Sequence, residues 1–183
     1  MIKEKGKVNF IFPKATSEDI PALLRLVETV WENMEHKEWF ALDDAAAYMN
    51  GLLATGKGRI WKAIDRKTCR LAGLYAITCP GTDSDNLRYD LELPETDLLQ
   101  VVHMDAVVVD PLYRGCGIQR KLTDLAEQEL AAEGYRYFMC TIHPDNIYSK
   151  NNMEKSGYRV VKKVFKYGGL PRLILLKTEI RSC

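Results

Sequence analysis

The sequence lacks a long hydrophobic run, a paired-cysteine motif and an excess of charge of one sign. No apolar stretch approaches the roughly 20 residues that a membrane span needs, and residues 1–7 lack the apolar core of a signal peptide. The 183 residues carry 26 basic and 25 acidic side chains, a formal net charge of +1. That balance gives no field for collecting nucleic acid or an anionic membrane without local recognition. We therefore expect no nucleic-acid partner and no membrane partner.

The five cysteines form no CxxC pair and are odd in number; they are Cys69, Cys79, Cys116, Cys140 and Cys183. This pattern argues against a disulfide framework and against a zinc site, and we expect no metal. It favours free, mostly buried thiols in a protein of the reducing cytoplasm. Neither Cys116 nor Cys140 has a base at a recognisable spacing, so we expect no acyl-enzyme on either thiol.

The hydrophobic pattern predicts one α/β domain over residues 1–183. The apolar share of 46% and the charged share of 28% are ordinary for a globular domain of this length. A capping box from Thr16 to Asp19 opens the first expected helix, and a second helix is expected from about Lys37. Further helices are expected after the 114–120 loop and over 146–156; the expected strands are 8–12, 59–64, 69–78, 98–109, 135–142, 158–165 and 170–177. This order predicts one sheet with parallel and antiparallel pairs.

Two glycines lie at the start of a helix, shortly after a strand that ends Val107-Val108-Val109. After this strand the chain reads Asp110-Pro111-Leu112-Tyr113-Arg114-Gly115-Cys116-Gly117-Ile118-Gln119-Arg120. Glycine lets a ligand approach the backbone without a Cβ in the way. The first amides of a helix have no internal acceptor and carry the positive end of the helix dipole. The segment therefore suits a diphosphate.

Two common nucleotide-binding signatures do not fit this loop. A Rossmann fingerprint needs a third glycine at position 120, which is Arg here. A P-loop needs Gly-Lys-Ser/Thr after four spacer residues, and no segment matches it. For the loop alone, a structural turn that starts a helix is the alternative interpretation.

The segment Val-x-Val-Asp-Pro-x-Tyr-Arg-Gly-x-Gly-Ile closely resembles the signature of the GCN5-related N-acetyltransferases, the GNAT superfamily, with its core Arg/Gln-x-x-Gly-x-Gly/Ala. Residues 14–20 are similar to the opening of that family, and residues 143–146 with 154–158 to its last motif. The resemblance implies the GNAT (acyl-CoA N-acyltransferase) fold: a mixed, mostly antiparallel central sheet of about seven strands flanked by about four helices. It also implies direct acetyl transfer from acetyl-CoA, as acyl donor, to a primary amine.

The resemblance further implies which residues hold the cofactor. Backbone groups of residues 107–109 would pair with the pantetheine arm, and amides of residues 115–120 would hold the pyrophosphate. Asn146 would hydrogen-bond the thiol end, and Ser149 follows on the same helical face. The expected cofactor-binding residues are Val107, Val108, Val109, Arg114, Gly115, Cys116, Gly117, Ile118, Gln119, Arg120, Asn146 and Ser149.

Two residues depart from the family pattern. Gln119 occupies the last Gly/Ala position of the core motif, so the spacing between helix and cofactor can differ there. Met153 stands where many relatives have a tyrosine that protonates the leaving thiolate, and a thioether cannot donate a proton. The usual general acid is therefore missing from its usual place.

Two polar residues on the strand before the loop are the candidate catalytic groups. Asp105 and His103 lie four and six residues before Val109, and this even spacing predicts one strand face for all three. Asp105 matches the commoner position of the family's general base, and His103 a position used in its histone-modifying branch. The alternative is that His103 is a satisfied strand residue and that Asp105 caps a loop.

The acceptor stays open at the level of sequence. We expect a small-molecule or peptide amine as partner, and we leave homodimer formation open. Trp31, Trp39 and Tyr48 fall on the first helices, which flank the acceptor cleft in the GNAT fold, although we expect Trp31 to pack in the core. Transfer of another acyl group, use of another acceptor, and a non-catalytic CoA-binding module remain the alternative functions.

Overall fold

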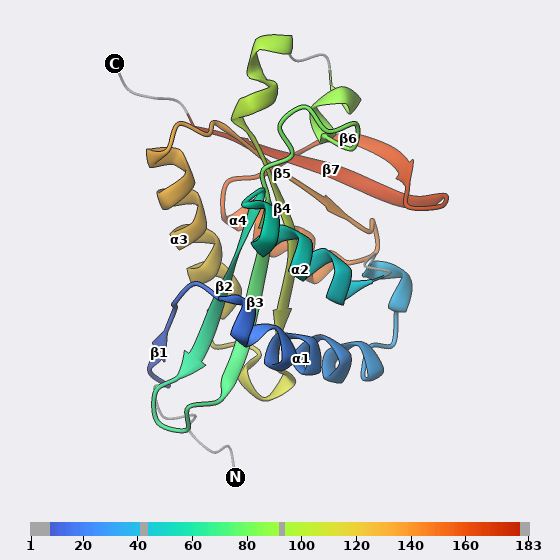
Figure 1. Ribbon diagram of the computed structural model, residues 1–183. Helices are drawn as coiled ribbons and strands as arrows, with labels where there is room; N and C mark the ends of the chain where they lie inside the picture. The colour runs from blue at the N-terminus through green and yellow to red at the C-terminus, as the bar shows by residue number, and fades with distance from the viewer. Residues whose placement is uncertain (1–7, 41–43, 92–93, 180–183) are drawn as a thin grey trace.

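One seven-stranded sheet organises the part of the chain that the computed structural model describes, residues 8–40, 44–91 and 94–179 (Figure 1). The strands are β1 (Phe10–Ile11), β2 (Gly58–Asp65), β3 (Leu71–Thr78), β4 (Val101–Val109), β5 (Tyr137–Ile142), β6 (Arg159–Lys166) and β7 (Leu170–Thr178). Their order is β1-β2-β3-β4-β5-β7-β6. Only β4 and β5 pair in parallel, and the other neighbours are antiparallel. The mixed, mostly antiparallel sheet predicted from the sequence is confirmed.

Helices cover both faces of this sheet (Figure 1). The α-helices are α1 (Ile20–Glu32), α2 (Ala45–Thr55), α3 (Ile118–Ala132) and α4 (Ile147–Lys155). Short 3-10 helices are η1 (Ser17–Asp19), η2 (Lys37–Trp39), η3 (Leu87–Asp90), η4 (Glu95–Gln100) and η5 (Pro111–Tyr113). The helices α1 and α2 pack on one face, and α3 and α4 pack on the other. In the described ranges, no helix combines the length and the apolar character needed to cross a membrane.

The core consists of an apolar layer on each side of the sheet. On one side, Leu23 of α1 and Met49 of α2 are fully buried against Leu74 of β3. On the other side, Leu122 of α3 packs with Phe138 of β5. Burying a side chain of this kind contributes about 1.5–3 kcal/mol, so these two layers fix the strands that carry the candidate site.

The start of the first helical segment agrees with the sequence, but the start of the second does not. The Thr16 amide donates to Asp19 Oδ2 at 2.8 Å, as the capping box predicts. The helix expected from about Lys37 begins only at Ala45, because the Asp44 side chain accepts the Ala47 amide at 2.8 Å and caps the helix there. Residues 37–39 form η2 instead. Leu42, which falls within the expected helix, lies outside the described residues.

The strand expected from Leu98 begins three residues later. Pro94 precedes the 3-10 helix η4, and this helix takes up the chain as far as Gln100. Proline favours such a start because its fixed φ suits the first turn of a helix. The long strand β4 therefore runs from Val101 to Val109.

The described cysteines are all free thiols, as predicted. The expectation that most are buried was wrong: only Cys140 is fully buried, Cys79 and Cys116 are half-buried, and Cys69 is exposed. Cys69 lies at a turn with φ of +56°, which places it at the surface. Cys183 lies outside the described residues.

Candidate active site

The strands β4 and β5 are paired at one end and separate at the other. Their parallel pairing covers only Val101–His103 against Tyr137–Met139. Beyond His103, β4 continues beside β3, with Val107 opposite Tyr75 and Val109 opposite Gly73. In the described chain, the β5-facing edge of β4 thus has no paired strand from residue 104 onward. Backbone groups along such an edge can pair with an extended ligand.

A bulge in β4 lies at the point where the two strands separate. Ala76 pairs with Ala106 and Thr78 with His103, so Met104 and Asp105 together lie opposite one residue of β3. An extra residue in one strand resets the alternation of side chains between the two faces.

The bulge corrects one prediction from the sequence. His103, Asp105 and Ala106 line one cleft on the α2 side of the sheet. Val109 packs instead with the apolar cluster on the α3 side. The even spacing placed Asp105 and His103 together, but it placed Val109 on the wrong face, because it assumed an uninterrupted pleat.

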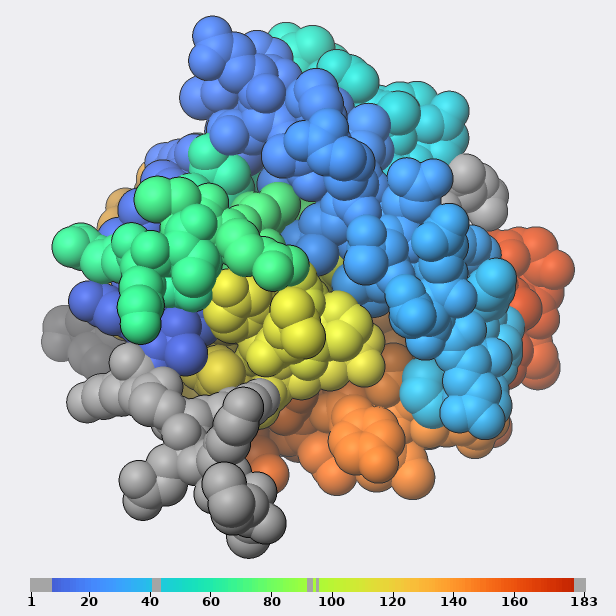
Figure 2. Space-filling view, turned by 90° about the horizontal axis from the view of Figure 1, so that it is seen from below, coloured from blue at the N-terminus to red at the C-terminus, as the bar shows by residue number. Residues whose placement is uncertain are grey.

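The glycine loop connects β4 to α3 through two left-handed turns. Gly115 has a φ of +80°, and Gly117, the N-cap of α3, has a φ of +74°. Residues other than glycine rarely adopt this backbone conformation. A Cβ added to either glycine would meet nothing within 4 Å, so the space outside both is open. Figure 2 shows the segment that follows β4, in yellow, exposed at the surface beside the chain around the start of α4, in orange.

The N-terminus of α3 offers unpaired amides to this open space. The Lys121 amide is the first to bond back into the helix, to the Gly117 carbonyl at 3.0 Å. No side chain caps the helix at Gly117. The amides of residues 118–120 therefore point out of the helix with the positive end of its dipole, which suits a pyrophosphate.

Side chains around the loop fix its position. The Ile118 side chain is buried in the core and leaves only its backbone available for a ligand. Gln119 accepts a hydrogen bond from Asn152 Nδ2 at 2.9 Å and lies 3.9 Å from Met153 Sδ. Gln119 thus links α3 to α4, while Gly115 and Arg120 are exposed and Cys116 is half-buried.

The helix α4 follows β5, the strand that separates from β4 beyond His103. Asn146 is the N-cap of α4, and its Oδ1 accepts the Ser149 amide at 3.1 Å. This bond leaves the two N–H groups of the Asn146 side chain for a ligand. Met153 is 3% exposed and packs in the core, so this side chain is a structural part of α4.

The carboxylate of Asp105 lies in a hydrogen-bonded cluster within the cleft. Its Oδ2 accepts the hydroxyl of Tyr48 at 2.6 Å and also the hydroxyl of Thr78. The side chain is 30% exposed, so protein surrounds the carboxylate while a substrate can still reach it. Burial raises the pKa of Asp105, against the opposing effects of His103, Thr78 and Tyr48. A carboxylate with a raised pKa is a better base than an ordinary one.

Burial also raises the pKa of Tyr48, and the charge of Asp105 adds to that effect. The phenol therefore stays protonated and serves as a donor to the carboxylate. Tyr48 thereby favours the ionised form of Asp105.

His103 is buried and makes a different contact. Its Nε2 accepts the Leu87 amide at 3.0 Å, so the ring proton of the neutral form lies on Nδ1. Nδ1 lies 4.0 Å from Asp105 Oδ1. Burial lowers the pKa of His103 more than the charge of Asp105 raises it. A base needs a free lone pair, but the lone pair on Nε2 already accepts the Leu87 amide. This geometry favours a positioning role for His103.

The cleft around Asp105 has a volume of about 480 Å³. Its walls come from η2, α2, the end of β3, the middle of β4, Thr141 of β5, residues 85 and 87, and the hairpin between β6 and β7. Trp39 and Tyr48 line it, as expected from the first helices, whereas Trp31 lies outside the lining and is 36% exposed. A volume of this size suits a small ligand.

Known proteins show the same sequence pattern and the same fold. Residues 91–158 match the model of the acetyltransferase (GNAT) family. Ribosomal-protein-alanine N-acetyltransferase from Brucella melitensis is 18% identical, with 92% of this chain and 99% of that chain covered and a TM-score of 0.69. The sequence of residues 91–158 is thus of the GNAT family, and the fold of the chain is the GNAT fold. A comparison of this chain with curated protein sequences found no match.

Two further solved structures share the GNAT fold and contain acetyl-CoA. NAA60 from Arabidopsis thaliana in complex with acetyl-CoA is 12% identical, with 93% of this chain and 98% of that chain covered and a TM-score of 0.70. The yncA protein from Salmonella typhimurium with its cofactor acetyl-CoA is 15% identical, with 94% and 95% covered and a TM-score of 0.69. At these identities, the likeness concerns the fold.

Three residues of the cleft could not be predicted from the sequence. Thr78 bonds to Asp105 across 27 residues, a separation that carries no periodic signal. Tyr167 and Arg172 belong to the last hairpin, whose Tyr-Gly-Gly turn indicates only a change of direction. Tertiary folding alone brings these residues into one cleft with Asp105.

Proposed function

We propose that this protein is an N-acetyltransferase that transfers the acetyl group of acetyl-CoA directly to a primary amine. The amine acceptor would occupy the cleft on the α2 side of the sheet. The cofactor would lie along the open edge of β4, with its pyrophosphate at the N-terminus of α3.

One observation carries the proposal: the unpaired edge of β4 joins the two parts of the site. At one end of this edge, Gly115 and Gly117 open an uncapped helix N-terminus. At the other end, Asp105 presents a carboxylate with a raised pKa to a cleft. Acyl transfer from acetyl-CoA to an amine needs a site that holds the diphosphate of the donor and a group that accepts the proton of the amine. This strand would bring the two together.

The residues of the cofactor end fit acetyl-CoA. Amides of residues 118–120 would hold the pyrophosphate, and the backbone of Val107–Val109 would pair with the pantetheine arm. Asn146 would use its remaining N–H groups toward the thiol end. When bound, acetyl-CoA supplies a thioester carbonyl that an amine nitrogen can attack.

The proton of the amine needs an acceptor, because a primary amine is mostly protonated near neutral pH. Asp105 takes this proton directly or through one water, and the neutral amine then attacks the carbonyl carbon. The new C–N bond replaces the C–S bond, the sulfur leaves with the bonding electron pair, and the nitrogen releases its second proton to solvent to give the neutral amide. Tyr48 and Thr78 hold the carboxylate in place during this step.

The leaving thiolate receives no proton from Met153, which is buried and has no acidic hydrogen. A simple thiol has a pKa of about 8.5, so its thiolate is a tolerable leaving group near neutral pH. Solvent then supplies the proton.

Release of free CoA thiol tests the proposal. Purified protein is incubated with acetyl-CoA and a panel of primary amines, including amino acids, small metabolite amines and peptides with a free N-terminus. We expect amine-dependent release of thiol, with the acetylated amine seen by mass spectrometry. Acetyl-CoA binding without release for any amine would instead favour a non-catalytic CoA-binding module. Competition among acyl-CoA donors distinguishes acetyl transfer from transfer of a larger acyl group.

A further inference from the structure

A buried guanidinium without an acidic partner lies in the wall of the acceptor cleft. Arg172 of β7 is 2% exposed, and its side chain forms part of the cleft lining. Buried charges in proteins are normally paired with an opposite charge. In the described part of the chain, no carboxylate lies within ion-pair distance of Arg172.

The present contacts of Arg172 are with neutral groups. Nη1 donates to the Pro171 carbonyl and Nη2 to the Glu38 carbonyl, each at 2.9 Å. The guanidinium lies 5.5 Å from the centre of the Tyr167 ring. The nearby carboxylate of Glu38 is engaged with His36 Nδ1 at 3.2 Å. Because a guanidinium has five N–H groups, donors remain for a further acceptor.

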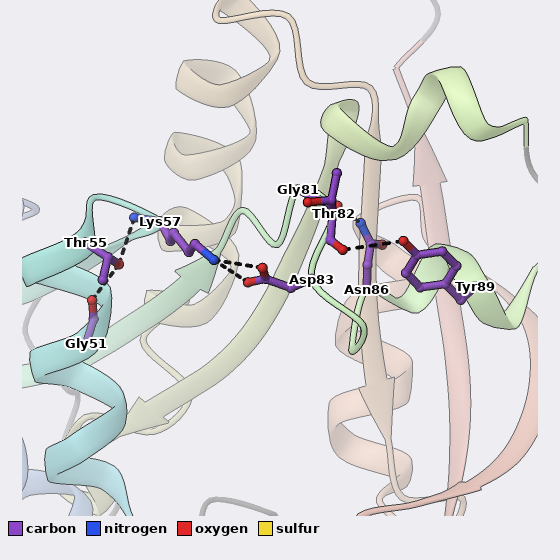
Figure 3. Close-up of polar contacts among 8 residues, drawn as sticks. All are labelled: Gly51, Thr55, Lys57, Gly81, Thr82, Asp83, Asn86 and Tyr89. Atoms are coloured by element: carbon purple, nitrogen blue, oxygen red, sulfur yellow. Dashed lines mark hydrogen bonds and ion pairs between the residues drawn. The ribbon is translucent and has the colours of Figure 1, made fainter.

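The other cations of the cleft are already neutralised. Lys57 pairs with Asp83 at 2.6 Å, and Figure 3 shows the ammonium between both oxygens of that carboxylate. Lys166 pairs with Asp90 at 2.7 Å. Arg172 is therefore the cation of the described cleft that has no carboxylate of its own.

The acidic groups of the cleft belong to a different part of its wall. Asp105 comes from β4, and the exposed Asp85 comes from the segment before η3. Arg172 has Tyr167 beside it: the Tyr167 ring lies against the guanidinium, and its hydroxyl shares a hydrogen bond of 3.1 Å with Thr141 of β5. The cleft thus offers carboxylates to an ammonium group and a guanidinium to an anion.

We propose that the acceptor carries a carboxylate as well as the reacting amine, as a free amino acid does. The amine would meet Asp105, and the carboxylate would meet Arg172 in the planar, charge-assisted arrangement that guanidinium groups favour. The cleft volume of about 480 Å³ leaves room for a ligand that carries both groups. This inference rests on the proposed acetyltransferase function and narrows its acceptor.

Matched pairs of amines test the inference. Phenylalanine is compared with phenethylamine, leucine with isoamylamine, and each amino acid with its methyl ester, at saturating acetyl-CoA. We expect kcat/KM to be on the order of 10–100-fold higher for the free amino acid in at least one pair. Equal or better use of the carboxylate-free amines throughout would overturn the inference, while their acetylation would leave the proposed function intact. No thiol release from any amine would overturn the proposed function, and the inference with it.

Substitutions identify the residue that is responsible. Arg172→Met should remove the preference for the free amino acid and leave kcat/KM for the carboxylate-free partner nearly unchanged. Arg172→Lys, which keeps a buried cation if the first variant does not fold, should retain only part of the preference. Lys166→Met is the matched control, because it removes a cleft cation that is already paired, and the preference should persist. If Arg172 merely holds η2 in place, both members of each pair will lose activity equally, which would overturn the inference.

Discussion

The hydroxyl of Tyr48 donates a 2.6 Å hydrogen bond to Oδ2 of Asp105, across 57 residues of sequence. This bond favours the ionised carboxylate, whereas burial favours the protonated one. Its removal should raise the pKa of Asp105 further. Because the base must be ionised, the acid limb of the kcat/KM profile of Tyr48→Phe should shift to higher pH.

We expect a loss of about tenfold in kcat/KM for Tyr48→Phe on the acid side of the profile, and a smaller loss at alkaline pH. Tyr89→Phe is the control, since Tyr89 is an exposed tyrosine whose hydroxyl lies 3.5 Å from the Thr82 carbonyl (Figure 3). A uniform loss at every pH would show that Tyr48 acts by packing alone.

Replacing the proposed base tests the mechanism directly. Asp105→Asn should lower turnover on the order of 10²-fold near neutral pH, the range usual for removal of a general base. The loss should shrink as pH rises, because more of the amine is then already neutral. A pH–rate profile of kcat/KM with one accepted amine measures both effects.

Met153→Leu is the companion to that experiment. The thioether donates no proton and packs in the core, so a substitution that conserves volume should change turnover little. Full activity at neutral pH in both Asp105→Asn and His103→Ala would mean that the amine loses its proton to solvent. The strand β4 would then be a scaffold for the cofactor without a catalytic side chain.

A negative charge placed in the glycine loop should prevent acetyl-CoA from binding at the start of α3. Acetyl-CoA at 100 times its dissociation constant should stabilise the native protein by about 2.7 kcal/mol. Gly117→Glu should abolish this protection, because it places a negative charge beside amides 118–120. NADH, which lacks the pantetheine arm, should give little protection. Thermal unfolding with and without each ligand provides the measurement.

Gly56→Glu is the matched control for the glycine experiment. Gly56 also has a positive φ, of +67°, and open space around it, but it ends α2. Both variants carry the same added charge and comparable backbone strain of about 1–3 kcal/mol. If both keep the protection by acetyl-CoA, the loop does not bind the pyrophosphate.

The buried His103 should make the free energy of unfolding depend on pH. Burial lowers its pKa in the folded protein, so the unfolded chain binds more protons just below the ordinary value of 6.5. Stability from the neutral ring is therefore complete above that value and falls as pH decreases toward the folded pKa. The charges of Asp105, Asp85, Asp90 and Lys166 also act on this ring.

Urea unfolding between pH 7 and pH 5.5 measures this dependence. The free energy of unfolding should decrease with a slope of up to about 1.4 kcal/mol per pH unit. His103→Asn should remove most of that slope, because the substituted side chain does not titrate. The same slope in the variant would assign the dependence to another group.

The sequence was sufficient for the parts of the fold that depend on local pattern. The capping box at Thr16, the glycines at 115 and 117, and the helix start at Asn146 all depend on residues within one turn of each other. Such signals act through neighbouring backbone groups and can be recognised without the rest of the chain.

Features that depend on partners distant in sequence were not predictable in this way. The bulge at Met104 and Asp105 follows from pairing with β3, and nothing in the local alternation indicates it. The same is true of the Leu87 amide on His103, which turns a candidate base into an acceptor that is already occupied. The roles of the site residues in binding and catalysis stay predictions until they are measured.

Because β4 carries one extra residue, the length of this strand determines which face of the sheet Asp105 occupies. With it, Asp105 and Ala106 both face the cleft, while Met104 and Val107 pack on the opposite side. Deleting Met104 would leave Asp105 alone opposite Ile77, restore the regular alternation and turn the carboxylate into the apolar core. Insertions and deletions should therefore be tolerated in the surface turns of this protein and rejected within these few positions.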